Sequence, residues 1–113
     1  MRVLNPETGL REAIQSEGVQ IVQFGAAGCA PCTALEQKLA RWCRTHPAVD
    51  FLYVPLETCP AAAAQEGIFT TPAILVFMQG RMTLRESGYF SLEAILSRIE
   101  RDLSLMAEAN QEN

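Results

Sequence analysis

Residues 24–32 read FGAAGCAPC and place Cys29 three positions before Cys32. A mostly apolar run at 19–24 leads into the cysteines, and an amphipathic run from Ala34 to about Arg44 follows them. We therefore expect a strand to end, and a helix to begin, at the first cysteine. The free N–H groups and the positive dipole end of a helix favour thiolate over thiol, and the thiolate is the nucleophilic form of cysteine.

The spacing of the two cysteines indicates a redox centre. Cys32 lies one helical turn after Cys29, on the same side and within reach of a disulfide, and a C-x-x-C beside alternating strands and helices is typical of a reversible dithiol. Two alternatives remain, an inert pair of small residues and half of a zinc site. Zinc needs two further ligands, and Cys43, Cys59 and His46 show no second paired spacing. We expect no metal and no organic cofactor.

Length and composition limit the class of protein. The 113 residues leave room for one domain with a core, expected over residues 1–113, and 49% of them are apolar, which suits a packed globule. A net charge of -4 argues against a nucleic-acid partner. No apolar run approaches the roughly 18–20 residues needed to span a bilayer, so we expect no membrane partner.

The cysteine content also bears on the cellular compartment. Residues 1–6 soon turn polar and include no apolar segment of signal-peptide length. We therefore expect a cytoplasmic location, where reducing systems keep most thiols reduced. Two structural disulfides among the four cysteines are the weaker interpretation in such a chain.

The residues before the cysteine pair predict a strand, a helix and a second strand. Residues 2–4 are expected to form a short edge strand. Asn5-Pro6-Glu7 has the signature of a helix start, with asparagine as N-cap and proline at the first helical position, and Gly18 would end that helix. The strand at 19–24 is apolar enough to lie in the centre of a sheet, covered on both faces.

After the cysteine-bearing helix, strands and helices continue to alternate. The predicted elements are a buried strand at 49–56, a short helix capped by Thr58, a strand at 73–78, an antiparallel strand at 81–87, and a final helix capped by Ser91 whose last residues, 107–113, fray. This order predicts an α/β fold in three layers, with a central mixed sheet of four to five strands between helices.

Taken together, these residues resemble the thioredoxin family over nearly the whole chain. The motifs that carry the resemblance are Cys29-Ala30-Pro31-Cys32 after a strand, Thr71-Pro72 opening a later strand, the turn at Gly80, and Gly88 before the last helix. The resemblance implies the thioredoxin fold and a thiol–disulfide oxidoreductase that reduces protein disulfides, with Cys29 attacking and Cys32 resolving. It implies disulfide-containing protein substrates, and a reductase or a small thiol as electron donor.

The resemblance also implies a substrate groove beside the cysteines. Pro72 would be the family's cis-proline, and the exposed backbone of Thr71 would let a substrate strand pair there. The residues expected to contact substrate are Gly28, Ala30, Pro31, Thr71, Pro72 and Gly88.

The chain departs from the family's usual pattern near the cysteines. Gly28 stands where tryptophan is usual, and Ala30 replaces the usual glycine. Gln23 replaces an aspartate six residues before the first cysteine, and Tyr53 replaces the lysine that commonly partners it. An amide cannot act as a base. If Gln23 lies at the proton-transfer position, the proton of the second cysteine must pass to water or to another group, for which Glu57 is the candidate.

These departures leave other functions open. A binding module could hold a partner at the Thr71-Pro72 groove with little redox turnover. Cys59, at the start of a short helix, is a candidate second reactive thiol and would make a redox-sensing regulator, although an ordinary capping-region residue is the favoured interpretation. Cys43 and Trp42 lie on an apolar helical stripe and are expected in the core. His46 is expected at a solvated helix end.

Overall fold

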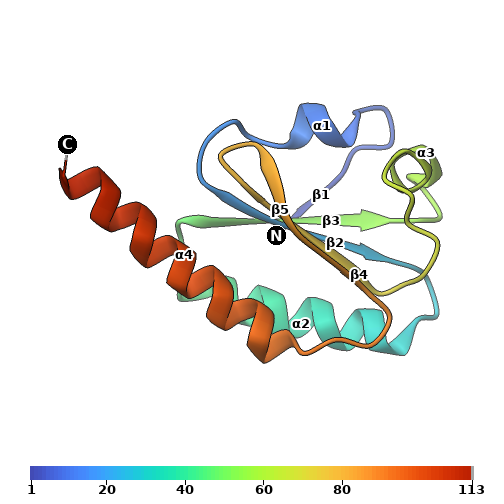
Figure 1. The fold of residues 1–113 in the computed structure, drawn as a ribbon. Coiled ribbons are helices and arrows are strands. Elements are labelled where there is room, and N and C mark those ends of the chain that lie inside the picture. Colours follow the sequence, from blue (N-terminus) through green and yellow to red (C-terminus); the bar gives the residue numbers. More distant parts are fainter. Residues whose placement is uncertain (113) are drawn as a thin grey trace.

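A computed structural model describes residues 1–112. Along the chain the elements are β1 (Arg2–Val3), α1 (Leu10–Ala13), β2 (Val19–Gly25), α2 (Ala30–Arg44), β3 (Val49–Pro55), α3 (Pro60–Gln65), β4 (Ala73–Met78), β5 (Arg81–Ser87) and α4 (Leu92–Glu112). The strands form one mixed sheet in the order β1-β3-β2-β4-β5 (Figure 1). β3 is parallel to β1 and β2, whereas β4 is antiparallel to β2 and β5. The predicted α/β class and the mixed sheet are confirmed.

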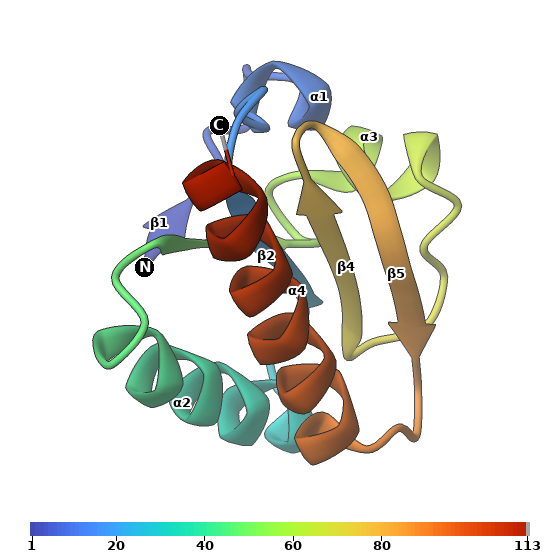
Figure 2. The ribbon, with the colours of Figure 1, turned by 60° about the vertical axis from the view of Figure 1, so that its left-hand side comes forward.

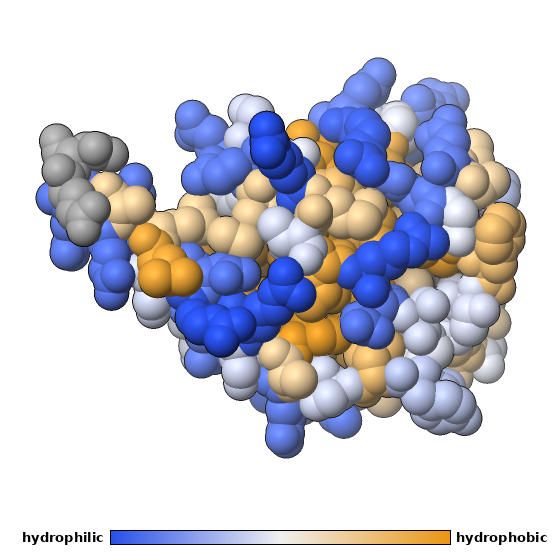
Figure 3. Space-filling model, in the orientation of Figure 1, coloured by the Kyte–Doolittle hydropathy of each residue, from blue (hydrophilic) through white to orange (hydrophobic). Residues whose placement is uncertain are grey.

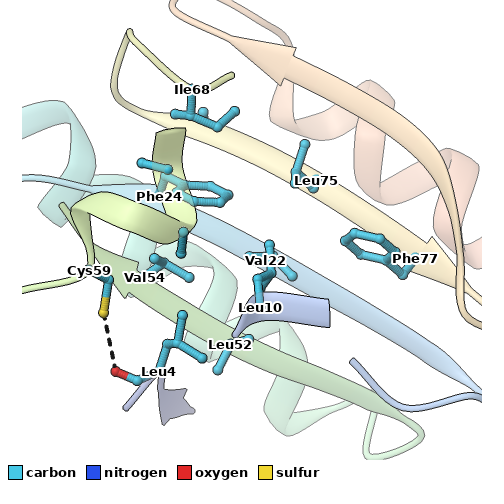
Figure 4. Close-up of a cluster of buried hydrophobic side chains, with 13 residues drawn as sticks. Leu4, Leu10, Val22, Phe24, Leu52, Val54, Cys59, Ile68, Leu75 and Phe77 are labelled. Atoms are coloured by element: carbon cyan, nitrogen blue, oxygen red, sulfur yellow. Dashed lines mark hydrogen bonds between the residues drawn. The ribbon is translucent and has the colours of Figure 1, made fainter. Parts of the chain in front are cut away.

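Helices cover both faces of this sheet, α1 and α3 on one face and α2 and α4 on the other (Figures 1 and 2). β2 is buried along its whole length, and its side chains alternate between the two faces. Val22 and Phe24 belong to the core under α1 and α3, shown in Figure 4. Val19 and Ile21 belong to the core under α2 and α4, and Gln23 points to the same face as they do. The end of β2 therefore carries Gln23 toward the helix that holds the cysteines.

The cysteine-bearing helix begins at Ala30, directly after the first cysteine, as the sequence predicts. Cys29 is its N-cap, with extended backbone, and Pro31 lies in its first turn. Proline there removes no helical hydrogen bond, because the first N–H groups of a helix have no partner within it. Cys32 is consequently inside the helix.

Two predicted helix starts are wrong. Asn5 Oδ1 accepts a hydrogen bond from the N–H of Glu7 at 2.9 Å, so asparagine forms a local turn, and α1 begins only at Leu10. The N-cap of α3 is Cys59 and not Thr58, whose hydroxyl instead donates to Pro55 O at 3.5 Å.

The last helix confirms the predicted cap. The Oγ of Ser91 accepts from the N–H of Ala94 at 3.2 Å, so this serine caps α4 as predicted. Residues 107–112, in the stretch that the sequence predicts to fray, are helical and complete α4. Asn113 lies outside the described residues. Within residues 1–112, no helix combines the length and the apolar composition needed to cross a membrane.

Trp42 and His46 connect the end of α2 to α4, which the sequence pattern did not predict. Both are half-buried, and their rings stack with centroids 3.7 Å apart. The indole N–H of Trp42 donates to Glu100 Oε1 at 3.1 Å, and Nε2 of His46 lies 3.4 Å from the same oxygen. Trp42 is thus a bridge at the edge of the core, and His46 is not fully solvated.

Candidate active site

Cys29 and Cys32 form a disulfide at the start of α2, with their Cα atoms 5.3 Å apart. The side chain of Cys29 is half-buried, whereas Cys32 is only 1% exposed. The N–H of Cys32 points at the sulfur of Cys29 at a distance of 3.3 Å. One sulfur is therefore accessible at a helix N-terminus, and the other is shielded behind it.

Two loops that are distant in sequence meet beside this disulfide. The Thr71–Pro72 peptide bond is cis, as the resemblance implied. The hydroxyl of Thr71 lies 4.0 Å from the sulfur of Cys29, and the N–H of Gly88 donates to the carbonyl of Pro72 at 3.0 Å. The site is therefore assembled from the start of α2, the start of β4 and the end of β5.

The six residues expected to contact substrate all lie around Cys29. Gly28, Ala30 and Pro31 are exposed next to it in the chain, and Gly28 has φ +76°, a conformation that L side chains rarely adopt. Pro31, Pro72 and Gly88 together border an apolar hollow of about 310 Å³. Thr71 precedes Pro72 directly, and its hydroxyl lies near the sulfur of Cys29.

The two residues considered for proton transfer occupy different places. Gln23 is fully buried, and its Nε2 donates to the carbonyl oxygen of Cys32 at 2.9 Å. Its Oε1 is buried without a hydrogen-bond partner among the described residues. Glu57 is exposed, and its Oε2 accepts from the N–H of Ala27 in the active-site loop at 3.3 Å.

Tyr53 lies next to Gln23 and supports the end of β2. The two residues are register partners on β3 and β2, so their side chains point to the same face. Burial raises the pKa of Tyr53, and the negative charges of Glu36 and Glu57 raise it further. The place below the cysteines therefore contains a neutral amide and a neutral phenol, with no buried ion pair between them.

The ring of Tyr53 also explains a glycine that sequence reasoning missed. A Cβ added to Gly25 would lie 2.8 Å from Cζ of Tyr53 and closer still to its hydroxyl. Gly25 therefore makes room for the ring where β2 enters the active-site loop. A glycine at the end of the predicted strand is visible in the sequence. Which side chain lies against it depends on the register between β2 and β3.

The remaining cysteines are poorly placed for redox chemistry. Burial raises the pKa of Cys43 to about 11. Cys59 is 3% exposed, and its thiol donates to the carbonyl of Leu4 at 3.5 Å (Figure 4). This burial disfavours Cys59 as a second reactive thiol and supports the capping-region interpretation. Within residues 1–112, no cluster of three or more His, Cys, Asp or Glu side chains is arranged to hold a metal ion.

A disulfide at a helix N-terminus, beside a cis-proline loop in an α/β sheet, defines the class of thiol–disulfide oxidoreductases. The family model for thioredoxin matches residues 2–101, and the chain belongs to the thioredoxin family. With the pair Cys29 and Cys32, the protein is a disulfide reductase of that family. The comparisons give no support to a binding module that uses the Thr71-Pro72 groove with little redox turnover.

Sequence and structure comparisons agree on this family. The chain is 26% identical to a thioredoxin of Alicyclobacillus acidocaldarius over 94 residues, which are 82% of this chain and 90% of the relative. It is 29% identical to Thioredoxin-2 of Pyricularia oryzae over 70 residues, covering 62% of this chain and only 41% of that longer protein.

Among solved structures, the thioredoxin of Fasciola hepatica superposes with a TM-score of 0.78 at 27% identity, covering 89% of this chain and 98% of that one. The oxidised mitochondrial thioredoxin 3 of Saccharomyces cerevisiae has a TM-score of 0.77 at 20% identity, covering 89% of this chain and 94% of its own, and supports the fold alone.

Proposed function

We propose that the reduced protein cleaves disulfides in protein substrates, with Cys29 as the attacking thiol and Cys32 as the resolving thiol. The observation that carries this assignment is their unequal shielding. Cys29 is half-buried at the N-terminus of α2, whereas Cys32 is 1% exposed within the helix. A bulky protein disulfide can approach only the sulfur that solvent reaches.

The reaction has two exchanges. The Cys29 thiolate attacks one substrate sulfur, the substrate S–S bond breaks, and the other sulfur leaves as a thiolate that takes up a proton. Cys32 then loses its proton and attacks the sulfur of Cys29. The Cys29–Cys32 disulfide forms, and the second substrate thiol is released. Two electrons pass from the protein to the substrate, and a reductase or a small thiol returns them by the reverse exchange.

Gly28, Ala30, Pro31, Thr71, Pro72 and Gly88 are proposed to contact the substrate backbone. Their arrangement around one accessible sulfur supports this role. For the second exchange, the proton of Cys32 goes to water or, through water, to the carboxylate of Glu57. Glu57 supports this route because it is held at the active-site loop by the N–H of Ala27.

The wider setting is also a proposal. Residues 1–113 act as one domain that carries electrons between a cytoplasmic donor and protein substrates, without nucleic-acid or membrane partners. A reducing compartment is where such a dithiol is regenerated, and the net charge of -4 disfavours phosphate surfaces.

The assignment is tested by reduction of insulin with a small thiol as donor, using wild type, Cys29→Ser and Cys32→Ser. Cys29→Ser should abolish the acceleration over the donor alone. Cys32→Ser should accumulate a mixed disulfide on Cys29, detected by mass spectrometry. A mixed disulfide that accumulates on Cys32 in the Cys29→Ser variant, with Cys32→Ser still turning over, would reverse the two roles.

A further inference from the structure

Two aromatic side chains on the loops of the active site stand out from the surface. Tyr89 is 106% exposed and Phe69 is 85% exposed, whereas the other exposed large hydrophobic residues are between 56% and 60% exposed. Aromatic surface left in water forgoes the free energy of burial, and contiguous exposed apolar surface marks interaction sites.

Both residues come from the loops that meet at Cys29. Phe69 is two residues before Thr71, whose hydroxyl lies 4.0 Å from the sulfur of Cys29. Tyr89 follows Gly88 directly, and the N–H of Gly88 donates a hydrogen bond to the carbonyl of Pro72. A Cβ on Gly88 would lie 4.0 Å from the methyl group of Thr70, so the two loops approach each other at the residues that adjoin Phe69 and Tyr89.

Each aromatic side chain borders an apolar hollow. Tyr89 borders the hollow of about 310 Å³ that contains Pro31 and Pro72. Phe69 borders a second one, of about 300 Å³, with Leu56 and Ile68. Residues 68–72 run from the second hollow to the first, and Figure 3 shows apolar surface at the right-hand edge of the molecule, on the side of α3. An extended chain lying along residues 68–72 would contact both hollows.

The charge at this surface indicates what such a chain carries. Among the residues lining the first hollow, only Lys38 is charged, and the second hollow is lined by uncharged residues. The protein as a whole is negative, with a net charge of -4. A local positive charge on a negative protein favours an acidic group in the partner.

We infer that Phe69 and Tyr89 determine substrate specificity by holding an extended segment with a large apolar side chain next to its disulfide cysteine and an acidic side chain near Lys38. This inference rests on the proposed function. The surface is continuous with the active site, so its occupant is the substrate itself.

The test compares short peptides whose single cysteine is joined by a disulfide to 2-mercaptoethanol. One peptide has phenylalanine next to the cysteine and the other has serine. The rate constant for oxidation of the reduced protein is measured by acid quenching and mass spectrometry. Wild type should prefer the phenylalanine peptide by about tenfold, the effect of one well-packed aromatic contact.

Variants at the two aromatic positions should remove this preference. Phe69→Ser with Tyr89→Ser should bring the ratio of the two rate constants to within about twofold of one, while Tyr89→Phe and Phe69→Tyr should keep it. Leu105→Ser is the matched control, because Leu105 is an exposed apolar residue on α4 that the two hollows do not include. Between two peptides that differ by glutamate or lysine, wild type should react faster with the glutamate peptide. Lys38→Glu should reverse this preference, most strongly at low salt.

The outcomes separate this inference from the proposed function. Wild type that ignores the phenylalanine, or a double variant that keeps the full preference, would overturn the inference. Sedimentation velocity gives one further outcome that would overturn it. If wild type is a dimer and the double variant is a monomer with an unchanged ratio of rate constants, the occupant of this surface is a second copy of the chain. The proposed function fails separately, if bis(2-hydroxyethyl) disulfide oxidises Cys29→Ser as fast as wild type.

Discussion

The side-chain amide of Gln23 donates a hydrogen bond to the main-chain carbonyl of Cys32, with Nε2 and the oxygen 2.9 Å apart. Gln23 is fully buried, so solvent does not compete for this contact. The amide therefore holds the first turn of α2 against the end of β2. It is neutral at every working pH and cannot accept the proton that Cys32 must lose.

Replacing this amide by a carboxylate should accelerate resolution. In Gln23→Asp, the decay of a mixed disulfide on Cys29 should become at least about tenfold faster, and a positioned base could accelerate it by as much as roughly 10²–10⁴-fold. Burial raises the pKa of such a carboxyl, so the acceleration should grow with pH as the aspartate ionises. Stopped-flow formation and decay of the mixed disulfide with a chromogenic disulfide measures it.

Gln20→Asp is the matched control, because Gln20 is 1% exposed on the same strand but points to the other face and bonds to Gln15 and Glu17. It should leave the decay rate unchanged. An unchanged rate in Gln23→Asp, with the fold intact by circular dichroism, would mean that proton removal does not limit resolution or that another base already serves.

A second prediction concerns Glu57. Glu57→Gln keeps an oxygen that can accept from the N–H of Ala27 but removes the base. If Glu57 accepts the proton through water, the mixed disulfide should decay about tenfold or more slowly in this variant, while the initial attack keeps its rate. Glu36→Gln is the control, since the charge of Glu36 also acts on Tyr53. Equal slowing in both variants would indicate a general charge effect.

A third prediction concerns the order in which the cysteines react. With limiting iodoacetamide and reduced protein, Cys29 should be alkylated first, because it is the accessible thiol at a helix N-terminus. Cys43 should lag far behind. Its pKa of about 11 leaves only about one thiolate in a thousand at pH 8, and labelling should rise about tenfold per pH unit below that pKa. Peptide mapping gives the order, and prior labelling of Cys32 would contradict the assignment of roles.

A fourth prediction tests the contact between Gly25 and Tyr53. Gly25→Ala should destabilise the fold by about 1–3 kcal/mol, because the new methyl group would overlap the tyrosine ring. In a Tyr53→Ala background the same change should cost little. The coupling free energy in a double-mutant cycle, from urea unfolding, should therefore be at least about 1 kcal/mol. If the free-energy changes of the two substitutions simply add, the constraint on Gly25 does not come from Tyr53.

Tyr53 also predicts a change of stability at high pH. Its folded-state pKa is raised, chiefly by burial, so the neutral phenol is favoured in the folded protein. Its contribution to the free energy of unfolding is fully present below the unfolded value near 10 and is lost as pH rises through the folded pKa. Tyr53→Phe should lose less stability than wild type between neutral and strongly alkaline pH. Identical pH profiles of the urea midpoint would contradict this.

Local features of the sequence were enough to predict the strand at β2, the cysteine pair after it, the order of the strands and helices, and the Ser91 cap. Each of these depends on residues within about one or two helical turns or on a two-residue alternation, and periodicity and capping act over that range. The family motifs added the position of Pro72 beside the cysteines. Asparagine is common both at helix N-caps and in turns, so the sequence around Asn5 is compatible with either. In the folded chain Asn5 forms a turn.

The finer site depended on contacts between segments far apart in the chain. Register between β2 and β3 places Tyr53 against Gly25, and packing of α2 on the sheet brings Gln23 to Cys32. The loops that carry Gly88 and Pro72 meet only in the folded chain. No local pattern encodes these pairings, because a shift of one residue in register would send every side chain of a strand to the opposite face. Burial of both faces of β2 selects one register, and that choice exists only in the folded chain.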